Sequence, residues 1–385
     1  MEAMPFVRPQ IPNFGAGPCA KPPGWELSHL KNVLIARSHR SIEGVERIQE
    51  VLYLLRLVLN IPENYKVTFV LGSATSAVET LFWNLLGKKK VQVHAWDIFG
   101  QRWANDIRKI LEINDFELLE LNSRKLPQFE KTNFEYDIIF TLNASTSGII
   151  ASNVSWISHN RQGLTLCDAT SAAFAIPLPW QFLDATAFSF QKGLGSEAGI
   201  GVIVLSPKAV ERLEKHTPLW PIPYLFRLTT DKGQLNKKLF EGFLLNTPSM
   251  LLIEDALHAL KWAQTIGNQQ ALYQRTLKNY NVIKKWLVTV SWLQFLVPLE
   301  ELRSPTTVCL EIIAPWFKLL TLGSQWEWIK QFCSLLAEQK VAFDIQNHIS
   351  AAPALRIWCG PTVETADLEN LMPWLDWAYH KLKKE

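Results

Sequence analysis

The most regular feature of the chain is an alternation, between residues 43 and 205, of short apolar runs with longer amphipathic stretches. The short runs are rich in β-branched residues and have the length of strands, whereas the longer stretches repeat apolar residues with the helical period. We predict strands over residues 67–71, 91–94, 116–119, 137–142, 164–168, 186–190 and 200–205, and helices over 43–60, 100–111 and from the turn after 71 to 86. Strands that alternate with helices are typical of a mostly parallel α/β sheet flanked by helices.

The pattern changes after residue 207, where a segment rich in proline and aromatic residues leads to a long helical stretch. We predict that this helix begins at Pro248 with Thr247 as its cap. From about residue 291 the chain reads as a compact α/β unit, with strands over 307–313 and 354–358 and helices over 325–339 and 364–381. The predicted organisation is an N-terminal arm over 1–24, a large domain over 25–265 and a small C-terminal domain over 266–385, with the boundary inside the long helix.

Composition narrows the class of protein without identifying it. The chain has 385 residues, enough for a large and a small domain, and its 39 basic and 36 acidic residues leave a net charge of only +3. So small and evenly spread an excess predicts no nucleic-acid partner. The apolar runs and the N-terminus predict no membrane span and no signal peptide, so we expect a soluble, cytoplasmic protein. The cysteines lack the spacing of metal ligands, which predicts free thiols and no metal site: Cys19, Cys167, Cys309, Cys333 and Cys359.

Candidate chemistry centres on Lys192 and Asp168, which close two predicted strands 24 residues apart. A lysine that leaves a buried strand into a glycine-rich turn can bond covalently to a carbonyl, and a carboxylate on a neighbouring strand can stabilise a protonated ring nitrogen. Each residue also has an ordinary explanation, Lys192 as a solvated loop lysine and Asp168 as a cap. Together they indicate pyridoxal phosphate chemistry.

The turn from Gly72 to Glu79 links a predicted strand to a predicted helix. Ser76 and Glu79 have the spacing of a capping box, and exposed N–H groups at such a helix start can bind phosphate. Taken alone, ordinary helix capping is the better explanation of this turn.

Longer motifs add a resemblance that covers nearly the whole chain. They lie at 12–21 (PNFGAGPCAK), 37–40 (RSHR), 167–171 (CDATS), 188–192 (FSFQK), 246–250 (NTPSM), 355–360 (LRIWCG) and 373–378 (PWLDWA). In these segments the chain resembles the phosphoserine aminotransferases, class V members of the fold type I pyridoxal phosphate enzymes, in the variety found in methanogenic archaea and alphaproteobacteria. The resemblance implies a large domain with a mostly parallel seven-stranded sheet and a small C-terminal α/β domain.

The resemblance also implies roles for individual residues toward pyridoxal phosphate. Lys192 would bind the cofactor covalently and later move a proton, and Asp168 would pair with the ring nitrogen. The cofactor phosphate would be held by residues of two subunits, so that a homodimer shares its active sites: Ala74, Thr75 and Gln191 from one subunit, and Asn246 and Thr247 from the other.

Three further positions would contact the cofactor ring. Phe99 occupies the position of a stacking aromatic residue, although a core phenylalanine before a helix is the plain alternative. Ser145 stands where the family usually has threonine, and its hydroxyl would donate to the phenolate oxygen of the ring. Thr146 would take that role if the turn is shifted by one residue.

Substrate contacts are implied for two basic segments. His39 and Arg40 resemble the residues that meet the anionic group of the substrate, and Arg356 resembles the one that grips its α-carboxylate. Arg356 lies within an apolar strand, where a guanidinium without an anion is costly. The chain departs from the family at Ile200 and at 241–245, which bears on substrate recognition.

The predicted activity is transamination between glutamate and 3-phosphohydroxypyruvate, giving O-phosphoserine and 2-oxoglutarate in serine biosynthesis. A related step on 4-phosphohydroxythreonine, toward vitamin B6, is chemically close. The alternatives are another class V activity, such as alanine:glyoxylate transamination or cysteine desulfuration, and a degenerate member that only binds partners. Desulfuration needs a mobile cysteine that faces the cofactor. Cys333 lies in a helical pattern and Cys359 follows a strand, so neither is well placed for this role.

Overall fold

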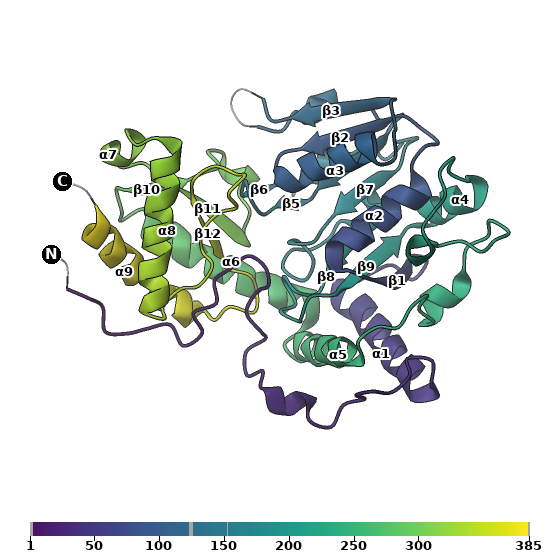
Figure 1. Cartoon of the computed structure of the whole chain (residues 1–385), viewed down its shortest axis with the longest axis horizontal. Coiled ribbons are helices and arrows are strands. Elements are labelled where there is room, and N and C mark those ends of the chain that lie inside the picture. Colours follow the sequence, from purple (N-terminus) through teal and green to yellow (C-terminus); the bar gives the residue numbers. More distant parts are fainter. Residues whose placement is uncertain (1–2, 123–125, 152, 384–385) are drawn as a thin grey trace.

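The strand-forming runs of the first half of the chain assemble into one seven-stranded sheet in the computed structural model, which describes residues 3–122, 126–151 and 153–383 (Figure 1). The spatial order is β1-β9-β8-β7-β4-β2-β3. β9 pairs antiparallel with β1 and β8, and the other neighbours pair parallel, which confirms the predicted mostly parallel sheet. The strand bounds are β1 Lys66–Leu71, β2 Val91–Ala95, β3 Phe116–Glu120, β4 Asp137–Thr141, β7 Thr165–Asp168, β8 Ala185–Ser189 and β9 Ile200–Leu205.

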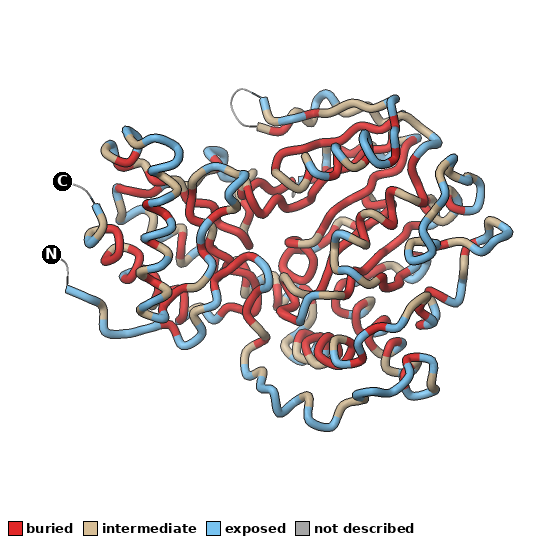
Figure 2. The backbone as a smooth tube through the Cα atoms, viewed as in Figure 1, coloured by how far each residue is buried: buried red, intermediate tan, exposed pale blue. Residues whose placement is uncertain are grey.

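Helices cover both faces of this sheet because its strands bury residues on both sides (Figure 2). Along β1, Val67 and Phe69 belong to one apolar core and Val70 to the other, as the two-residue period of a strand requires. Helices α2, α3 and α4 contribute to the core with Val70, and α1 and α5 to the core with Phe69. The helix bounds are α1 Ile42–Leu59, α2 Ser73–Leu85, α3 Ile98–Lys109, α4 Pro207–Lys215 and α5 Met250–Thr265.

A second, smaller α/β unit follows, as the sequence predicts. Its three-stranded antiparallel sheet has the order β10-β11-β12. Its core includes Phe14 and Ala16, so the N-terminal arm packs on this unit. The remaining bounds are β5 Asn143–Ala144, β6 Ile149–Ile150, α6 Asn268–Leu287, β10 Leu293–Phe295, β11 Thr307–Ile312, α7 Pro315–Lys318, α8 Leu322–Glu338, β12 Leu355–Trp358 and α9 Thr365–Leu382.

Two predictions about the long helix are wrong. The helix begins at Met250, and Ser249, whose backbone is extended (ψ 116°), is its cap residue. Pro248 misled the prediction because a proline fits an extended segment as well as the first turn of a helix. The helical stretch is also two helices, α5 and α6, separated at Gly267, whose φ of 113° favours glycine. This break lies beside residue 265, where we propose the domain boundary.

No helix within the described ranges is long and apolar enough to cross a membrane.

Candidate active site

Three parallel strands of the large sheet, β4, β7 and β8, end at one edge, and a cavity of about 200 Å³ lies there. In parallel sheets ligands bind beyond these carboxyl ends. The cavity collects residues from the arm, from the first turn of α2, from α3 and from the segments at the three strand ends. Its lining consists of Gly17, Pro18, Ser73, Ala74, Thr75, Asp97, Phe99, Trp103, Thr141, Asn143, Ser145, Asp168, Thr170, Ser171, Gln191, Lys192 and Ala198.

Lys192 lies just beyond β8 and lines this cavity. Its Nζ donates a hydrogen bond to the carbonyl of Ala16 in the N-terminal arm. The next arm residue, Gly17, has a φ of 146°, a backbone conformation that residues with a side chain rarely adopt. Burial lowers the pKa of Lys192, and the positive charge of Arg356 lowers it further. The amine is therefore more readily neutral, and thus nucleophilic, than an exposed lysine.

Asp168 ends β7, with Thr141 of β4 and Ala187 of β8 as its register partners. The carboxylate is buried and accepts hydrogen bonds from Trp103 Nε1 at 3.2 Å and from the Thr170 amide at 3.0 Å. Burial raises its pKa, while those hydrogen bonds and the charge of Lys192 oppose the shift. The structure thus brings Asp168 and Lys192 to one cavity.

The turn after β1 differs from the predicted capping box. α2 begins at Ser73 with Gly72 in the cap position at a φ of 109°, so Ser76 lies inside the helix and Glu79 accepts from Trp83 Nε1 instead. The turn is held by Gly199, which accepts from the Gly72 amide and donates to Ser73 Oγ, each at 2.9 Å. The sequence missed this because the stabilising partner lies 126 residues away along the chain.

Ala74 and Thr75 line the cavity in the first turn of α2. Amides in the first turn of a helix have no acceptor within the helix, and the helix dipole favours an anion there. Gln191 also lines the cavity, and its buried Oε1 has no hydrogen-bond partner among the described residues. These groups are suited to a phosphate and its surroundings.

Ser145 and Thr146 point to different places. Ser145 lines the cavity with Lys192, whereas Thr146 lines a neighbouring cavity and donates to Asp97 Oδ2 at 3.4 Å. Phe99 lines the first cavity from the start of α3. Of the two candidate hydroxyls, Ser145 is therefore the one that shares a cavity with Phe99 and Lys192.

Asp97 and Trp103 are among the lining residues of the cavity that sequence reasoning missed. Asp97 caps α3 by accepting from the Phe99 and Gly100 amides, and burial followed by the charge of Asp168 raises its pKa to about 6. Trp103 follows Phe99 by four residues, so both lie on one face of α3. The four-residue spacing of Phe99 and Trp103, with Asp97 just before the helix, is the feature of the sequence from which these two residues could have been predicted.

Besides Thr146, five predicted residues do not line the cavity within a single chain. His39 and Arg40 precede α1, the first buried and the second exposed, and Asn246 and Thr247 precede α5. Arg356 lies on β12 and its buried Nε has no partner in the described part of the chain. Ile200, a departure from the family pattern, is buried in the core opposite Leu71.

Comparison with known proteins agrees with this geometry. The chain is 44% identical over 375 residues to the phosphoserine aminotransferase of Methanosarcina barkeri, covering 97% of this chain and 98% of that one. The phosphoserine aminotransferase structure from Cytophaga hutchinsonii superposes with a TM-score of 0.77 at 21% identity, covering 94% of this chain and 98% of that one. A pyridoxal phosphate-bound phosphoserine aminotransferase from Trichomonas vaginalis gives 0.75 at 18% identity, covering 95% and 100%.

Pyridoxal phosphate, the cofactor of such enzymes, fits the cavity. Lys192 offers an amine to its aldehyde, Asp168 a buried carboxylate to its ring nitrogen, and the first turn of α2 and the Gln191 side-chain amide offer N–H donors to its phosphate. The model of the class-V aminotransferases matches residues 27–317. The chain therefore belongs to the class-V aminotransferases and, within them, to the family of phosphoserine aminotransferases.

Proposed function

We propose that the protein transfers the amino group of glutamate to 3-phosphohydroxypyruvate, giving O-phosphoserine and 2-oxoglutarate. The observation that carries this proposal is the placement of Lys192 and Asp168 in one cavity at the carboxyl edge of the sheet. The name of the Methanosarcina relatives supports the choice of substrates.

Lys192 is the base of the proposed reaction. Pyridoxal phosphate, when bound, supplies an aldehyde carbon that exchanges amino groups and a ring that accepts electrons. Lys192 would hold the cofactor through a neutral Nζ and would take up the proton from the substrate Cα, and its lowered pKa favours the neutral form. The carbonyl of Ala16 orients this nitrogen through a hydrogen bond.

Asp168 keeps the ring nitrogen protonated in this proposal. Trp103 Nε1 donates to Oδ2 and the Thr170 amide to Oδ1, so the carboxylate is held in one orientation. An ionised carboxylate in a buried site favours a cation beside it. The hydrogen bonds from Trp103 and Thr170 stabilise the ionised form of Asp168, which burial disfavours.

Arg356 is the proposed partner of the substrate α-carboxylate. Burial lowers its pKa, and its Nε lacks a hydrogen-bond partner among the described residues. In the part of the chain that the structure describes, Arg356 forms no ion pair, although the charge of Asp344 acts on it, so this half-buried guanidinium would gain a bidentate partner when an anionic substrate binds.

His39, Arg40, Asn246 and Thr247 would serve the active site of a second subunit. The loops that carry them lie on the side of α1 and α5 (Figure 1), where Gln49 Nε2 donates to the Glu241 carbonyl and joins the two regions. Apolar side chains are exposed in the same loops and at the helix starts: Ile35, Ile42, Phe243 and Leu251. We propose that this face forms a homodimer in which each subunit completes the site of the other.

The activity is tested by titrating the purified protein, loaded with pyridoxal phosphate, with glutamate and with O-phosphoserine. Each amino acid is expected to remove the absorption band of the lysine-linked cofactor, and 3-phosphohydroxypyruvate is expected to restore it. If alanine acts on the band in place of the phosphorylated amino acid, the enzyme is another class V transaminase. 4-Phosphohydroxythreonine in a parallel titration measures the vitamin B6 step.

Cysteine desulfuration is the weaker alternative. Cys333 lies on α8, Cys359 is buried beyond β12, and neither lines the cavity. Cys19 lies near Lys192, but burial raises its pKa to about 12, so its thiol stays protonated and is a poor nucleophile. The cytoplasmic location stays a prediction.

A further inference from the structure

Asp255, on α5, is a buried carboxylate outside the cavity that accepts hydrogen bonds from two segments far apart in the sequence. Only 1% of it is exposed. It accepts hydrogen bonds from Lys21 Nζ in the N-terminal arm at 2.9 Å and from Nε1 of Trp25, the residue just after the arm, at 3.0 Å. From the loop after Lys192 it receives Ser196 Oγ at 2.6 Å and the Glu197 amide at 2.8 Å. One side chain thus joins the arm to that loop.

The arm continues from this junction into the wall of the cavity. Gly17 and Pro18 line the cavity, and the Cys19 amide donates to the carbonyl of Gln191 at 2.9 Å. The arm also holds Lys192, through the hydrogen bond from its Nζ to Ala16. A displaced arm would therefore release both the lysine and the backbone next to it.

The loop leads from the same junction to the phosphate side of the cavity. Ala198 lines the cavity, and Gly199 is hydrogen-bonded to Gly72 and to Ser73 at the start of α2. The first turn of α2 depends on this loop because Gly72, its cap residue, offers no side-chain acceptor. The two segments that meet at Asp255 therefore both continue into the lining of the cofactor cavity.

We propose that Asp255 is a positioning residue for the cofactor, one that holds the arm against Lys192 and the loop against the start of α2. Removing the carboxylate would leave the half-buried Trp25 Nε1 and the buried Ser196 Oγ without this acceptor, which favours separation of the two segments. Lys21 would keep its ion pair with Glu197 in the loop at 2.8 Å, so the junction would be weakened and not abolished. The inference rests on assigning the cavity to pyridoxal phosphate. Its test uses no amino-acid substrate, so it can fail while the proposed transamination stands.

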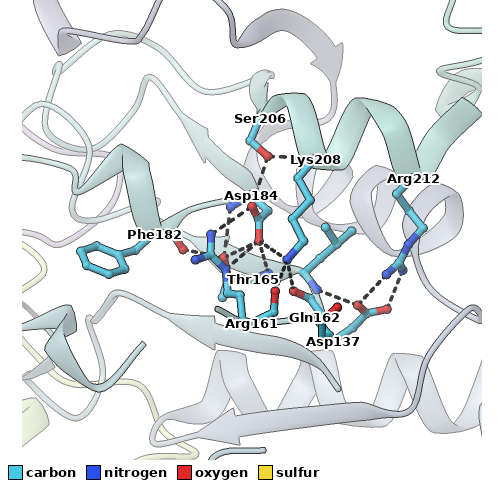
Figure 3. Close-up of polar contacts among 12 residues, drawn as sticks. Asp137, Arg161, Gln162, Thr165, Phe182, Asp184, Ser206, Lys208 and Arg212 are labelled. Carbon is cyan, nitrogen blue, oxygen red and sulfur yellow. Dashed lines mark hydrogen bonds and ion pairs between the residues drawn. The ribbon is translucent and has the colours of Figure 1, made fainter. Parts of the chain in front are cut away.

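The test compares Asp255→Asn with a matched control, Asp184→Asn. Asp184 is buried like Asp255. Its carboxylate accepts hydrogen bonds from Arg161 Nε and Nη2, each at 3.0 Å, and from the Thr165 amide at 2.9 Å (Figure 3). It precedes β8 and so lies at the amino end of the strands, away from the cavity. Both substitutions remove a buried carboxylate that accepts several hydrogen bonds. Only Asp255 is connected to segments that line the cofactor cavity.

The measurements are equilibrium titration of each apoprotein with pyridoxal phosphate, followed by tryptophan fluorescence, and limited proteolysis of the arm. Asp255→Asn is expected to weaken cofactor binding about ten-fold or more and to speed cleavage within residues 1–24. Asp184→Asn is expected to lower stability while it leaves cofactor affinity and arm cleavage as in the wild type.

Wild-type affinity in a folded Asp255→Asn protein would overturn the proposal, and so would equal weakening by Asp184→Asn. If Asp255→Asn does not fold, Lys21→Met and Ser196→Ala each remove one donor from the same carboxylate. Each is expected to weaken cofactor binding by about three-fold or more. Wild-type affinity in both would reject the assignment.

Discussion

Burial shifts the pKa of Lys192 and of Asp168 in the direction that favours the neutral form of each side chain. The pKa of the amine is lowered and the pKa of the carboxylate is raised, because an environment with little water disfavours either ion. The amine needs its neutral form to react, so burial assists it. The carboxylate needs its ionised form, which explains why Trp103 and Thr170 donate hydrogen bonds to it.

Substitution of Lys192 tests its role directly. Lys192→Ala is expected to reduce turnover by about 10³-fold or more, since both the covalent attachment and the base are lost. Lys192→Arg is the matched control for charge, and it should be equally inactive because a guanidinium stays protonated. Transamination is measured by 2-oxoglutarate formation, with circular dichroism as the check on folding. Wild-type turnover in either variant would contradict the assignment.

Asp97 makes a pH-dependent contribution to stability. Its pKa is raised by burial from 3.8 to about 6, so the folded state favours the protonated carboxyl. The stability that this group contributes is present below about pH 4 and is lost as the pH rises through about 6. Asp97→Asn, which preserves a capping side chain, should therefore gain roughly 3 kcal/mol relative to the wild type between pH 4 and pH 7. Urea unfolding of both apoproteins at each pH measures the difference, and a pH-independent difference would contradict the prediction.

At the scale of elements, the approach of α2 to β9 decides the geometry of the predicted phosphate turn. Gly201, the second residue of β9, lies so close to α2 that an added Cβ would come within 2.2 Å of the Ser73 carbonyl oxygen and 2.9 Å of Ala77 Cβ. No local pattern in the sequence shows this contact. The start of α2 can lie against the sheet only because position 201 has no side chain.

Gly201→Ala is expected to lower the free energy of unfolding by about 1–3 kcal/mol, because α2 must move away from the sheet. The same shift should weaken the binding of pyridoxal phosphate. Gly323→Ala on α8 is the control, since a Cβ there meets nothing within 4 Å and alanine favours a helix. Denaturant unfolding and cofactor titration measure the two effects, and equal behaviour of the variants would refute the explanation.

The elements themselves were predicted unevenly. The strands of the large sheet agree with the predicted ranges to within one residue at most ends, because their apolar period is strong. α4 was missed although Ser206 caps it through the Ala209 amide, because the proline-rich segment that follows masked its short pattern. The hairpin of β5 and β6, only two residues in each strand, is too short to produce a period.

For the whole molecule, the proposed dimer predicts complementation between two inactive variants. Lys192→Ala and Arg40→Ala homodimers are each expected to show little activity at low substrate concentration. After the two are mixed and exchange subunits, half of the dimers would be hybrids with one intact site, and activity should recover to about one quarter of the wild-type value. If Arg40 serves its own subunit, no hybrid has an intact site and activity does not recover.

The sequence alone determined the alternation of strands and helices, the small C-terminal unit, and the pairing of Lys192 with Asp168, because periodicity and strand-end residues are local properties. It also carried the resemblance to the family, which the comparisons confirmed. Only the tertiary structure revealed the start of α2 against Gly199, the arm beside Lys192, and Asp255 as their common anchor. These depend on contacts between residues tens to hundreds of positions apart, and such contacts follow from how the elements pack rather than from any local pattern.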